Sequence, residues 1–326
     1  MSRVHSDDSH AKTQADKALI VNFEPEDRDT VKVSSDAEDF TRDQCGTSTV
    51  GKAATFGLIA DNPKFWDRFQ ASISNLQENA PGGESYKVFF LGRHGLAKHN
   101  WLAPPPGPPE TAREDKLNLL DPELTELGEG QARAVNSEWK RNSSLGAPRP
   151  DLWLCSPLTR TAQTLRLSFE SLLGHDRPIF VEALREILHE RPCNKRRSKT
   201  YLQNNFPECD FEEGFSEEDT TWRPDGGQET EAERRTRLRE AMCKIFEERD
   251  ETYISITSHN FALSSLLMVL HHERHKFQPG EVLVVVVKGV RNGGRSDHKS
   301  REQECEVKIA SRTQEQSIEC MIGGIS

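Results

Sequence analysis

The hydrophobic positions of this chain form short apolar runs that alternate with longer segments of helical spacing. Five runs predict strands, at residues 88–91, 151–155, 178–182, 253–257 and 281–287. Apolar residues three or four positions apart predict helices across residues 65–76, 127–139, 158–169, 229–248 and 259–271. Strands that alternate with helices are typical of a mainly parallel sheet covered on both faces, so we expect an α/β protein with three layers, α/β/α.

Residues at several helix ends and faces sharpen these predictions. Thr125 is expected to cap the second helix. The fourth helix is predicted to bury Ala232, Leu238, Met242 and Phe246. Between the third strand and this helix, residues 189–228 are irregular, charged and rich in aromatic side chains, as a lid or a substrate-side insertion would be.

Both ends of the chain lack this patterning. Residues 1–55 are rich in Asp, Ser, Thr and Lys and have few apolar positions, which is typical of disordered segments. Apolar periodicity disappears again after residue 288. We therefore predict a disordered extension at 1–55, one folded domain at 56–288 and a disordered tail at 289–326.

Composition restricts the partners. The chain has 326 residues and a formal net charge of −10, which argues against a nucleic-acid surface but leaves room for a local basic site that binds an anionic substrate. The seven cysteines have no metal-ligand spacing and are expected to be reduced thiols. No signal peptide or membrane-length apolar run is visible, so we expect no membrane partner and a cytoplasmic location, with the nucleus as an alternative.

The strand at 88–91 leads directly into Arg93-His94-Gly95, and Gly92 and Gly95 indicate where strand gives way to loop. Open α/β sheets place their ligands at the carboxyl ends of strands. Histidine can attack phosphorus, and arginine can bind two phosphate oxygens at once. We therefore predict that His94 is a nucleophile and Arg93 a phosphate clamp. The alternative is a chance tripeptide beside a core strand.

Two further cations follow predicted strand ends. Arg160 begins the helix after the second strand, where it would hold phosphate near the positive end of that helix; a solvent-facing arginine is the alternative. His259 closes the strand at 253–257 and is expected to be protonated and to donate to phosphate, with a purely structural histidine as the alternative.

Two polar residues complete the predicted site. Glu186 comes just after the third strand, where a carboxyl among apolar neighbours can keep its proton near neutral pH and give it to a leaving oxygen. A surface ion pair with Arg185 is the alternative. Asn100 follows His94 in the same loop and is predicted either to donate to phosphate or to be a plain loop asparagine.

These residues lie in blocks that resemble the histidine phosphatase superfamily and its phosphoglycerate mutase-like fold. The resemblance covers roughly residues 56–288. The matching blocks are Phe90-Leu91-Gly92-Arg93-His94-Gly95, Asp121-Pro122-Glu123-Leu124-Thr125 with Gly128 and Gln131-Ala132, Cys155-Ser156-Pro157-Leu158-Thr159-Arg160-Thr161, Leu184-Arg185-Glu186 and Ser258-His259.

The resemblance implies a role for each residue of the site. Arg93, Arg160 and His259 would hold the phosphate. His94 would be transiently phosphorylated, and Glu186 would donate the proton. No metal and no organic cofactor is implied.

The chain looks closest to a branch of mutase-like phosphatases common in fungi. That branch carries a Cys-Asp-Lys-Arg-Arg-Ser block, which here is Cys193-Asn194-Lys195-Arg196-Arg197-Ser198. The chain departs from the pattern at Asn194, which replaces the acidic residue, and at Asn260, where most relatives have glycine. Lys195, Arg196 and Arg197 are predicted either to bind a multiply phosphorylated substrate or to form a solvated charge run.

We predict an intracellular histidine phosphatase, that is, a phosphoric monoester hydrolase. It would act on a small phosphorylated metabolite through a phosphohistidine intermediate and without a metal. A phosphoglycerate mutase-type phosphoryl transfer would use the same residues and is the first alternative. A non-catalytic protein that binds a phosphorylated ligand is the second. A role in a specialised metabolite pathway is compatible with each.

Overall fold

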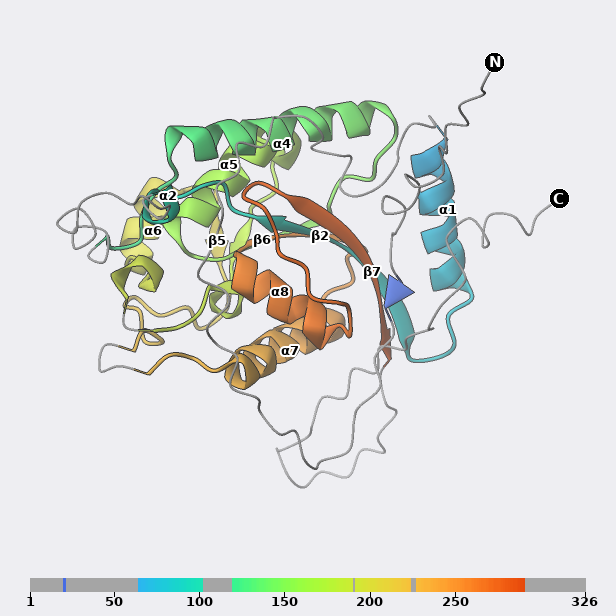
Figure 1. The fold of residues 1–326 in the computed structure, drawn as a ribbon. Coiled ribbons are helices and arrows are strands. Elements are labelled where there is room, and N and C mark those ends of the chain that lie inside the picture. Colours follow the sequence, from blue (N-terminus) through green and yellow to red (C-terminus); the bar gives the residue numbers. More distant parts are fainter. Residues whose placement is uncertain (1–19, 22–63, 102–118, 190, 224–226, 291–326) are drawn as a thin grey trace, which may run out of the picture.

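A central β-sheet organises the part of the chain that the computed structural model describes, namely residues 20–21, 64–101, 119–189, 191–223 and 227–290 (Figure 1). The sheet has seven strands in the order β1-β7-β2-β6-β3-β4-β5. They are β1 (Ile20–Val21), β2 (Glu84–Arg93), β3 (Leu152–Cys155), β4 (Ile179–Phe180), β5 (Asp210–Phe211), β6 (Tyr253–Ser258) and β7 (Val282–Val290).

Strand β2 lies inside the sheet, between β6 and β7. It runs parallel to β6, with Val88 opposite Tyr253 and Arg93 opposite Ser258, and antiparallel to β7. All other pairs are parallel. Because parallel strands end at the same edge of a sheet, the residues that follow β2, β3, β4 and β6 meet there.

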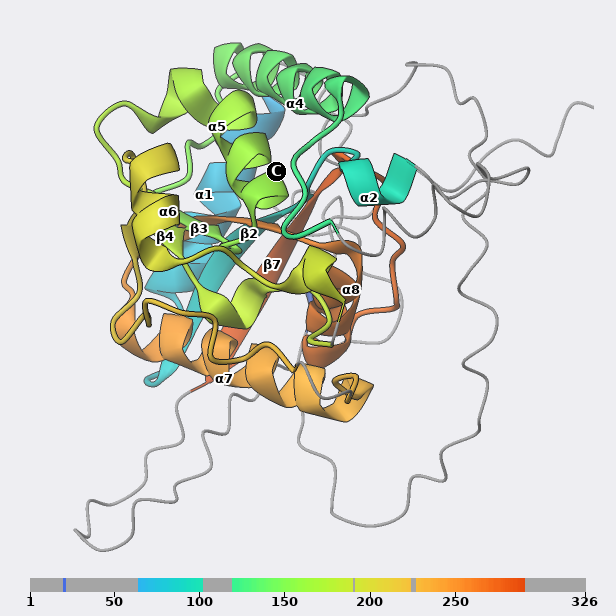
Figure 2. The same cartoon turned by 90° about the vertical axis from the view of Figure 1, so that its left-hand side faces the viewer.

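Helices cover both faces of the sheet, which confirms the predicted α/β/α layers and the mainly parallel sheet (Figures 1 and 2). One face carries α4 and α5, and the other carries α7 and α8. The longer helices are α1 (Phe65–Glu78), α4 (Glu126–Ser144), α5 (Thr159–Leu173), α7 (Glu231–Glu248) and α8 (Asn260–Val269).

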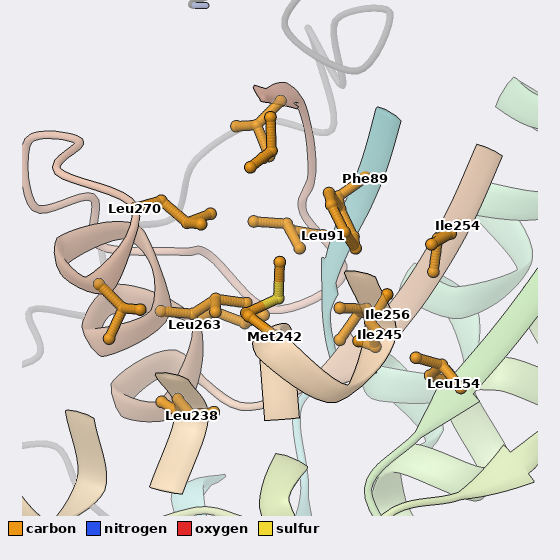
Figure 3. Close-up of a cluster of buried hydrophobic side chains, with 14 of the residues drawn as sticks. Phe89, Leu91, Leu154, Leu238, Met242, Ile245, Ile254, Ile256, Leu263 and Leu270 are labelled. Atoms are coloured by element: carbon orange, nitrogen blue, oxygen red, sulfur yellow. The ribbon is translucent and has the colours of Figure 1, made fainter. Parts of the chain in front are cut away.

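Alternate residues of β2 supply the two cores. Phe89 and Leu91 pack with side chains of α7 and α8, as Figure 3 shows. Val88 and Phe90 pack on the opposite face with side chains of α1, α4 and α5. Burial on both faces explains why this strand reads as an unbroken apolar run instead of an alternating one.

The helix ends agree with the sequence in most places. The Thr125 hydroxyl caps α4 by accepting from the Gly128 amide at 3.0 Å, as predicted. Ala232 is exposed, although it was predicted to be buried. The reason is that α7 starts at Glu231, so Ala232 lies in a solvent-facing first turn, and the buried face begins with Arg234.

The segment predicted to be irregular, 189–228, contains short elements where it is described. They are the 3₁₀ turn η3 (Pro192–Asn194), helix α6 (Lys199–Asn205) and strand β5. The third predicted strand is shorter than expected, because the 3₁₀ turn η2 (Glu182–Leu184) follows β4 closely.

The domain limits stay predictions, since most of 1–55 and 289–326 lies outside the described residues. Within those segments, β1 pairs with β7, and β7 continues to Val290. Over the described ranges, no helix combines the length and apolar character needed to cross a membrane.

Candidate active site

His94 follows the last residue of β2, and its backbone amide donates to the Ser258 carbonyl at 3.0 Å. Its ring Nδ1 lies 2.6 Å from the Gly95 carbonyl oxygen, which can only accept, so Nδ1 carries the proton and Nε2 carries the lone pair. Burial, and then the charges of Arg160 and Arg93, hold the pKa of His94 well below its usual value. His94 is therefore a neutral imidazole with a fixed tautomer, as a nucleophile requires.

Two glycines fix the loop that carries His94. A Cβ on Gly95 would lie 2.3 Å from the Gly128 carbonyl oxygen, and a Cβ on Gly128 would lie 2.1 Å from the Leu96 oxygen. The loop thus packs directly on the first turn of α4, closer than any side chain allows. The Gly95 amide also donates to the Thr164 hydroxyl at 3.0 Å, which joins the loop to α5.

His259 lies at the N-cap position of α8 with its ring centroid 5.0 Å from that of His94. Its Nε2 is 2.8 Å from the Ser156 hydroxyl, and its buried Nδ1 has no hydrogen-bond partner among the described residues. Burial and then Arg160 lower the pKa of His259 well below its usual value, which favours a neutral ring over the protonated one that the sequence predicted. A neutral ring that accepts from Ser156 still carries its proton on Nδ1 and can donate it to a ligand.

Arg160, in the first turn of α5, is fully buried. One terminal nitrogen donates to the Cys193 carbonyl at 2.8 Å, and the other donates to Oδ1 of Asn194 at 2.9 Å. Asp121 fixes the same turn by accepting from the Thr159 amide and hydroxyl at 2.8 and 2.7 Å. The alternative of a solvent-facing arginine is therefore wrong. Cys193 and Asn194, which follow η2 in the chain, fix the orientation of the Arg160 guanidinium.

Arg93 ends β2 and is 9 % exposed. A terminal nitrogen donates to the Phe277 carbonyl at 2.5 Å, which holds the guanidinium against the loop before β7. Its positive charge lowers the pKa values of His94 and Glu186, although burial is the larger influence on each. The charges of Arg93 and Arg160 thus lower the pKa values of the same two side chains, His94 and Glu186.

Glu186 follows η2 and is half-buried. Its Oε1 accepts from its neighbouring amide at Ile187, 3.1 Å away, and its Oε2 accepts from the Phe261 amide of α8 at 3.3 Å. Burial raises the pKa of this carboxyl, and Arg160, the Phe261 amide and Arg234 oppose that rise. A carboxyl with a raised pKa can hold a proton nearer to neutral pH, as a general acid must.

The alternative role of Glu186, an ion pair with Arg185, does not occur. The Arg185 guanidinium points into residues 191–223, called the insertion below, where it binds the Asp219 carboxylate at 2.7 and 2.6 Å and the Asn194 carbonyl at 2.6 Å. Arg185 is 1 % exposed, so this buried pair holds the insertion against η2.

Asn100 lies in the short helix α2 (Lys98–Trp101), not in a loop, and its buried Oδ1 has no partner among the described residues. Sequence reasoning missed its neighbour His99. The His99 ring centroid is 6.4 Å from that of His94, and its buried Nδ1 likewise has no partner in the described part of the chain. Burial and then Arg160 and Arg93 lower the pKa of His99 well below its usual value. In the sequence, the signal for His99 as a candidate site residue is its position directly before Asn100.

The three basic residues of the insertion differ in their surroundings. The Lys195 ammonium lies 4.1 Å from the Trp222 ring centre. Arg197 donates to the Leu120 carbonyl at 3.2 Å and stacks on Tyr201. Both are half-buried, so neither belongs to a solvated charge run.

Arg196 differs from its two neighbours because it is almost completely buried, at 2 % exposure. Its Nε donates to the Glu182 carboxylate. Its terminal nitrogens donate to the carbonyls of Arg197, Ser216, Glu217 and Glu218 and to the Ser216 hydroxyl. Since its five N–H groups are used within the protein, Arg196 holds the insertion together, and its predicted role in binding substrate has no support in this geometry.

A family model described as the histidine phosphatase superfamily (branch 1) matches residues 89–288, a range that contains His94, Arg160, Glu186 and His259. The chain belongs to the histidine phosphatase superfamily. The predicted phosphoglycerate mutase-like fold is thereby confirmed.

Two curated relatives of this chain come from fungi. One, named a probable phosphoglycerate mutase, is from Arthroderma benhamiae and is 30% identical over 236 residues, 68% of this chain and 70% of the relative. Phosphomutase-like protein 3 of Candida albicans is 32% identical over 251 residues, 74% of each chain. A solved structure of a mycobacterial glucosyl-3-phosphoglycerate phosphatase is 17% identical, has a TM-score of 0.38, and matches over 62% of this chain and 92% of its own.

Both departures from the family pattern lie beside residues of the candidate site. Asn194 orients Arg160, and its Nδ2 donates to the Ile187 carbonyl at 2.8 Å, so one amide joins the arginine to the segment of Glu186. Asn260 begins α8 directly after His259, with a buried Oδ1 that has no partner in the described residues.

The site offers cations instead of metal ligands. Within the described ranges, no group of three His, Cys, Asp or Glu side chains is arranged to hold a metal ion. The charges of Arg160 and Arg93 act on His94, and the His259 ring lies 5.0 Å from the His94 ring. Such an arrangement can bind a phosphate dianion and stabilise the charge that develops on its oxygens during transfer.

Proposed function

We propose that this protein is a phosphomonoesterase that hydrolyses a small phosphorylated metabolite through a phosphohistidine intermediate on His94, without a metal. The observation that carries the proposal is the state of His94. Its proton is fixed on Nδ1 by the Gly95 carbonyl, its pKa is lowered, and its Nε2 has no hydrogen-bond partner among the described residues. A histidine with a purely structural role would be expected to use both ring nitrogens.

In the first half of the reaction, Arg93, Arg160 and His259 bind the phosphate of the ester. Nε2 of His94 attacks phosphorus, and an N–P bond forms as the bond between phosphorus and the leaving oxygen breaks. Glu186 gives its proton to that oxygen, so the product leaves as a neutral alcohol. Arg160 acts most strongly at this stage, because negative charge builds up on the phosphoryl oxygens.

In the second half, water attacks the phosphohistidine. Glu186, now ionised, takes a proton from the water as the new P–O bond forms and the N–P bond breaks. Inorganic phosphate leaves, and His94 and Glu186 return to their starting states. The half-buried position of Glu186 supports access of water to this side of the site.

Asn100, Lys195 and Arg197 are proposed as secondary substrate contacts. The unpartnered Oδ1 of Asn100 and the position of its helix beside His94 support a contact to the substrate. Lys195 directly follows Asn194, which contacts Arg160, and Arg197 lies three residues after Asn194, so their charges would strengthen the positive field around the phosphate.

A phosphoenzyme assay tests the proposal directly. The protein is incubated with a panel of phosphomonoesters, quenched in base, and probed for phosphate that is stable to alkali and labile to acid. Wild type and a His175→Ala control, which changes an exposed histidine, should be labelled and active. His94→Ala should show neither label nor turnover. Normal turnover by His94→Ala would overturn the mechanism.

The same panel separates hydrolysis from phosphoryl transfer, which the name of the fungal relative raises. Each substrate is assayed with and without bisphosphoglycerate. Release of inorganic phosphate that bisphosphoglycerate does not stimulate supports a phosphatase. Isomerisation of phosphoglycerate that depends on bisphosphoglycerate would instead assign a mutase.

A further inference from the structure

Arg234 is a buried arginine that the mechanism above does not use. It lies on the inner face of α7 and is 6 % exposed. Its Nε donates to the Ser265 hydroxyl of α8 at 2.8 Å. Helices α7 and α8 lie side by side on the same face of the sheet in both views (Figures 1 and 2).

The bond to Ser265 joins Arg234 to the helix that also contacts Glu186, the proposed general acid. Ser265 lies four residues after Phe261, so the two are about 6 Å apart along the same side of α8. The Phe261 amide is the group that donates to Oε2 of Glu186. The charges of Arg234 and Glu186 act on each other, since each shifts the pKa of the other. Arg234 therefore lies on the side of the site where Glu186 meets the leaving oxygen.

Two other carboxylates near Arg234, those of Glu229 and Glu231, are already bound to other arginines. Glu229 accepts two hydrogen bonds from Arg237, both at 2.8 Å, and Glu231 accepts one from Arg274 at 2.5 Å. Within the described part of the chain, the two terminal nitrogens of Arg234 form no hydrogen bond. A guanidinium held through Nε has a planar pair of terminal N–H groups left to meet an anion.

We propose that Arg234 binds an anionic oxygen group, such as a carboxylate or a second phosphate, on the leaving group of the substrate. The inference rests on the proposed function, because Glu186 marks the leaving-group side only if it is the general acid. In this proposal Arg93 and Arg160 bind the phosphate that is transferred, and Arg234 binds the anionic group on the leaving group. The preferred substrates are then phosphate esters of acids, not of neutral alcohols.

A matched pair of esters tests this specificity. 3-Phosphoglycerate and glycerol 3-phosphate differ only in having a carboxylate or a hydroxymethyl group. Wild type should prefer the carboxylate in kcat/KM. Arg234→Gln should lower kcat/KM for 3-phosphoglycerate about tenfold to a hundredfold, the scale of a lost charge-assisted hydrogen bond, and change glycerol 3-phosphate less than about threefold. A second pair, propane-1,3-diol bisphosphate and its monophosphate, tests whether a phosphate replaces the carboxylate.

Three further variants define the role. Arg234→Lys keeps the charge and should recover part of the preference. Ser265→Ala releases Nε and should weaken the preference while Arg234 remains. Arg133→Gln changes an exposed arginine of α4, which lies 3.8 Å from Glu129, and should have no effect on either ester. Thermal unfolding of each variant identifies any that fail to fold.

The outcomes separate the two proposals. If Arg234→Gln slows both esters equally and moves the alkaline limb of the pH profile, Arg234 merely adjusts Glu186, and the specificity proposal is wrong. Equal use of both esters by wild type overturns it as well. If wild type hydrolyses neither pair nor any ester of the panel, the proposed function itself fails.

Discussion

Replacing Glu186 by glutamine removes the proposed general acid while preserving its shape. The amide oxygen of glutamine can still accept from the Phe261 amide, which binds Oε2 at 3.3 Å in the wild type. The side chain is half-buried, so the fold should tolerate the change. What is lost is the transferable proton that burial helps the carboxyl to keep by raising its pKa.

The size of the effect should depend on the leaving group. General acid catalysis contributes about 10²- to 10⁴-fold, which corresponds to about 2.7–5.5 kcal/mol of barrier. An alkyl phosphate, whose alkoxide departs poorly, should lose that whole factor in kcat/KM. p-Nitrophenyl phosphate, whose phenolate departs without a proton, should lose less than about tenfold.

The pH dependence has a definite sign. The proposed general acid acts in its protonated form, so wild-type activity on alkyl phosphates should fall as pH rises through the raised pKa of the Glu186 carboxyl. The pKa of His94 is lowered, so the nucleophile stays neutral to well below its usual titration range and adds no limb near neutral pH. Glu186→Gln should lose the alkaline fall on alkyl phosphates.

The assay compares p-nitrophenyl phosphate with glycerol 2-phosphate across pH for wild type, Glu186→Gln and a control. Glu248→Gln is a suitable control, because Glu248 is exposed at the end of α7 and only approaches Lys244 at 4.0 Å. Equal slowing of both esters by Glu186→Gln would refute the general-acid role. It would direct the search for the acid to residues 189–228.

Three further predictions concern other parts of the site. Arg160→Ala should lower kcat more than it raises KM in steady-state kinetics, because the arginine acts mainly on charge that develops in the transition state; a loss confined to KM would make it a binding residue only. Exhaustive chelation should leave hydrolysis unchanged, and activity that returns only on addition of magnesium or zinc would contradict the metal-free mechanism. Gly128→Ala should lower both the melting temperature and kcat, because its Cβ would lie 2.1 Å from the Leu96 oxygen and displace the His94 loop. The control Gly130→Ala should leave kcat unchanged, because nothing lies within 4 Å of a Cβ at that position.

The strand ends and their chemistry were predictable from the sequence because both are local. The apolar run before Arg93-His94-Gly95 predicts a strand, and the polar residues that follow it indicate the strand end. The run before His259 does the same. Glu186 was placed correctly after the third strand, although that strand proved to be only Ile179–Phe180. The hydrogen bond from the Phe261 amide to Glu186 depends on how α8 packs against the segment of Glu186. No local sequence pattern predicts that packing.

Other features depend on contacts between distant segments. Arg196 and Arg197 are adjacent and chemically alike, but their surroundings differ. Arg196 donates hydrogen bonds to four carbonyls, a hydroxyl and the Glu182 carboxylate, whereas Arg197 stacks on Tyr201. The orientation of β7, antiparallel to β2, is likewise set by the path of the chain after α8 and not by the apolar run itself. Arg234 was not predicted as a site residue, although it lies four positions before Leu238 on the buried face of α7, because an arginine on a charged helix is usually exposed.

The place of β2 in the sheet has a consequence for synthesis of the protein. β2 leaves the ribosome before β3, β4 and β5, but both of its hydrogen-bonding neighbours, β6 and β7, are translated after those strands. Until then β2, with its apolar run Val88–Leu91, has two unpaired edges, and such edges promote misfolding and association with other chains. We therefore expect chains truncated before β6 to be aggregation-prone and unable to accept a phosphoryl group on His94, and the intact domain to fold slowly, as domains dominated by pairing between distant segments do.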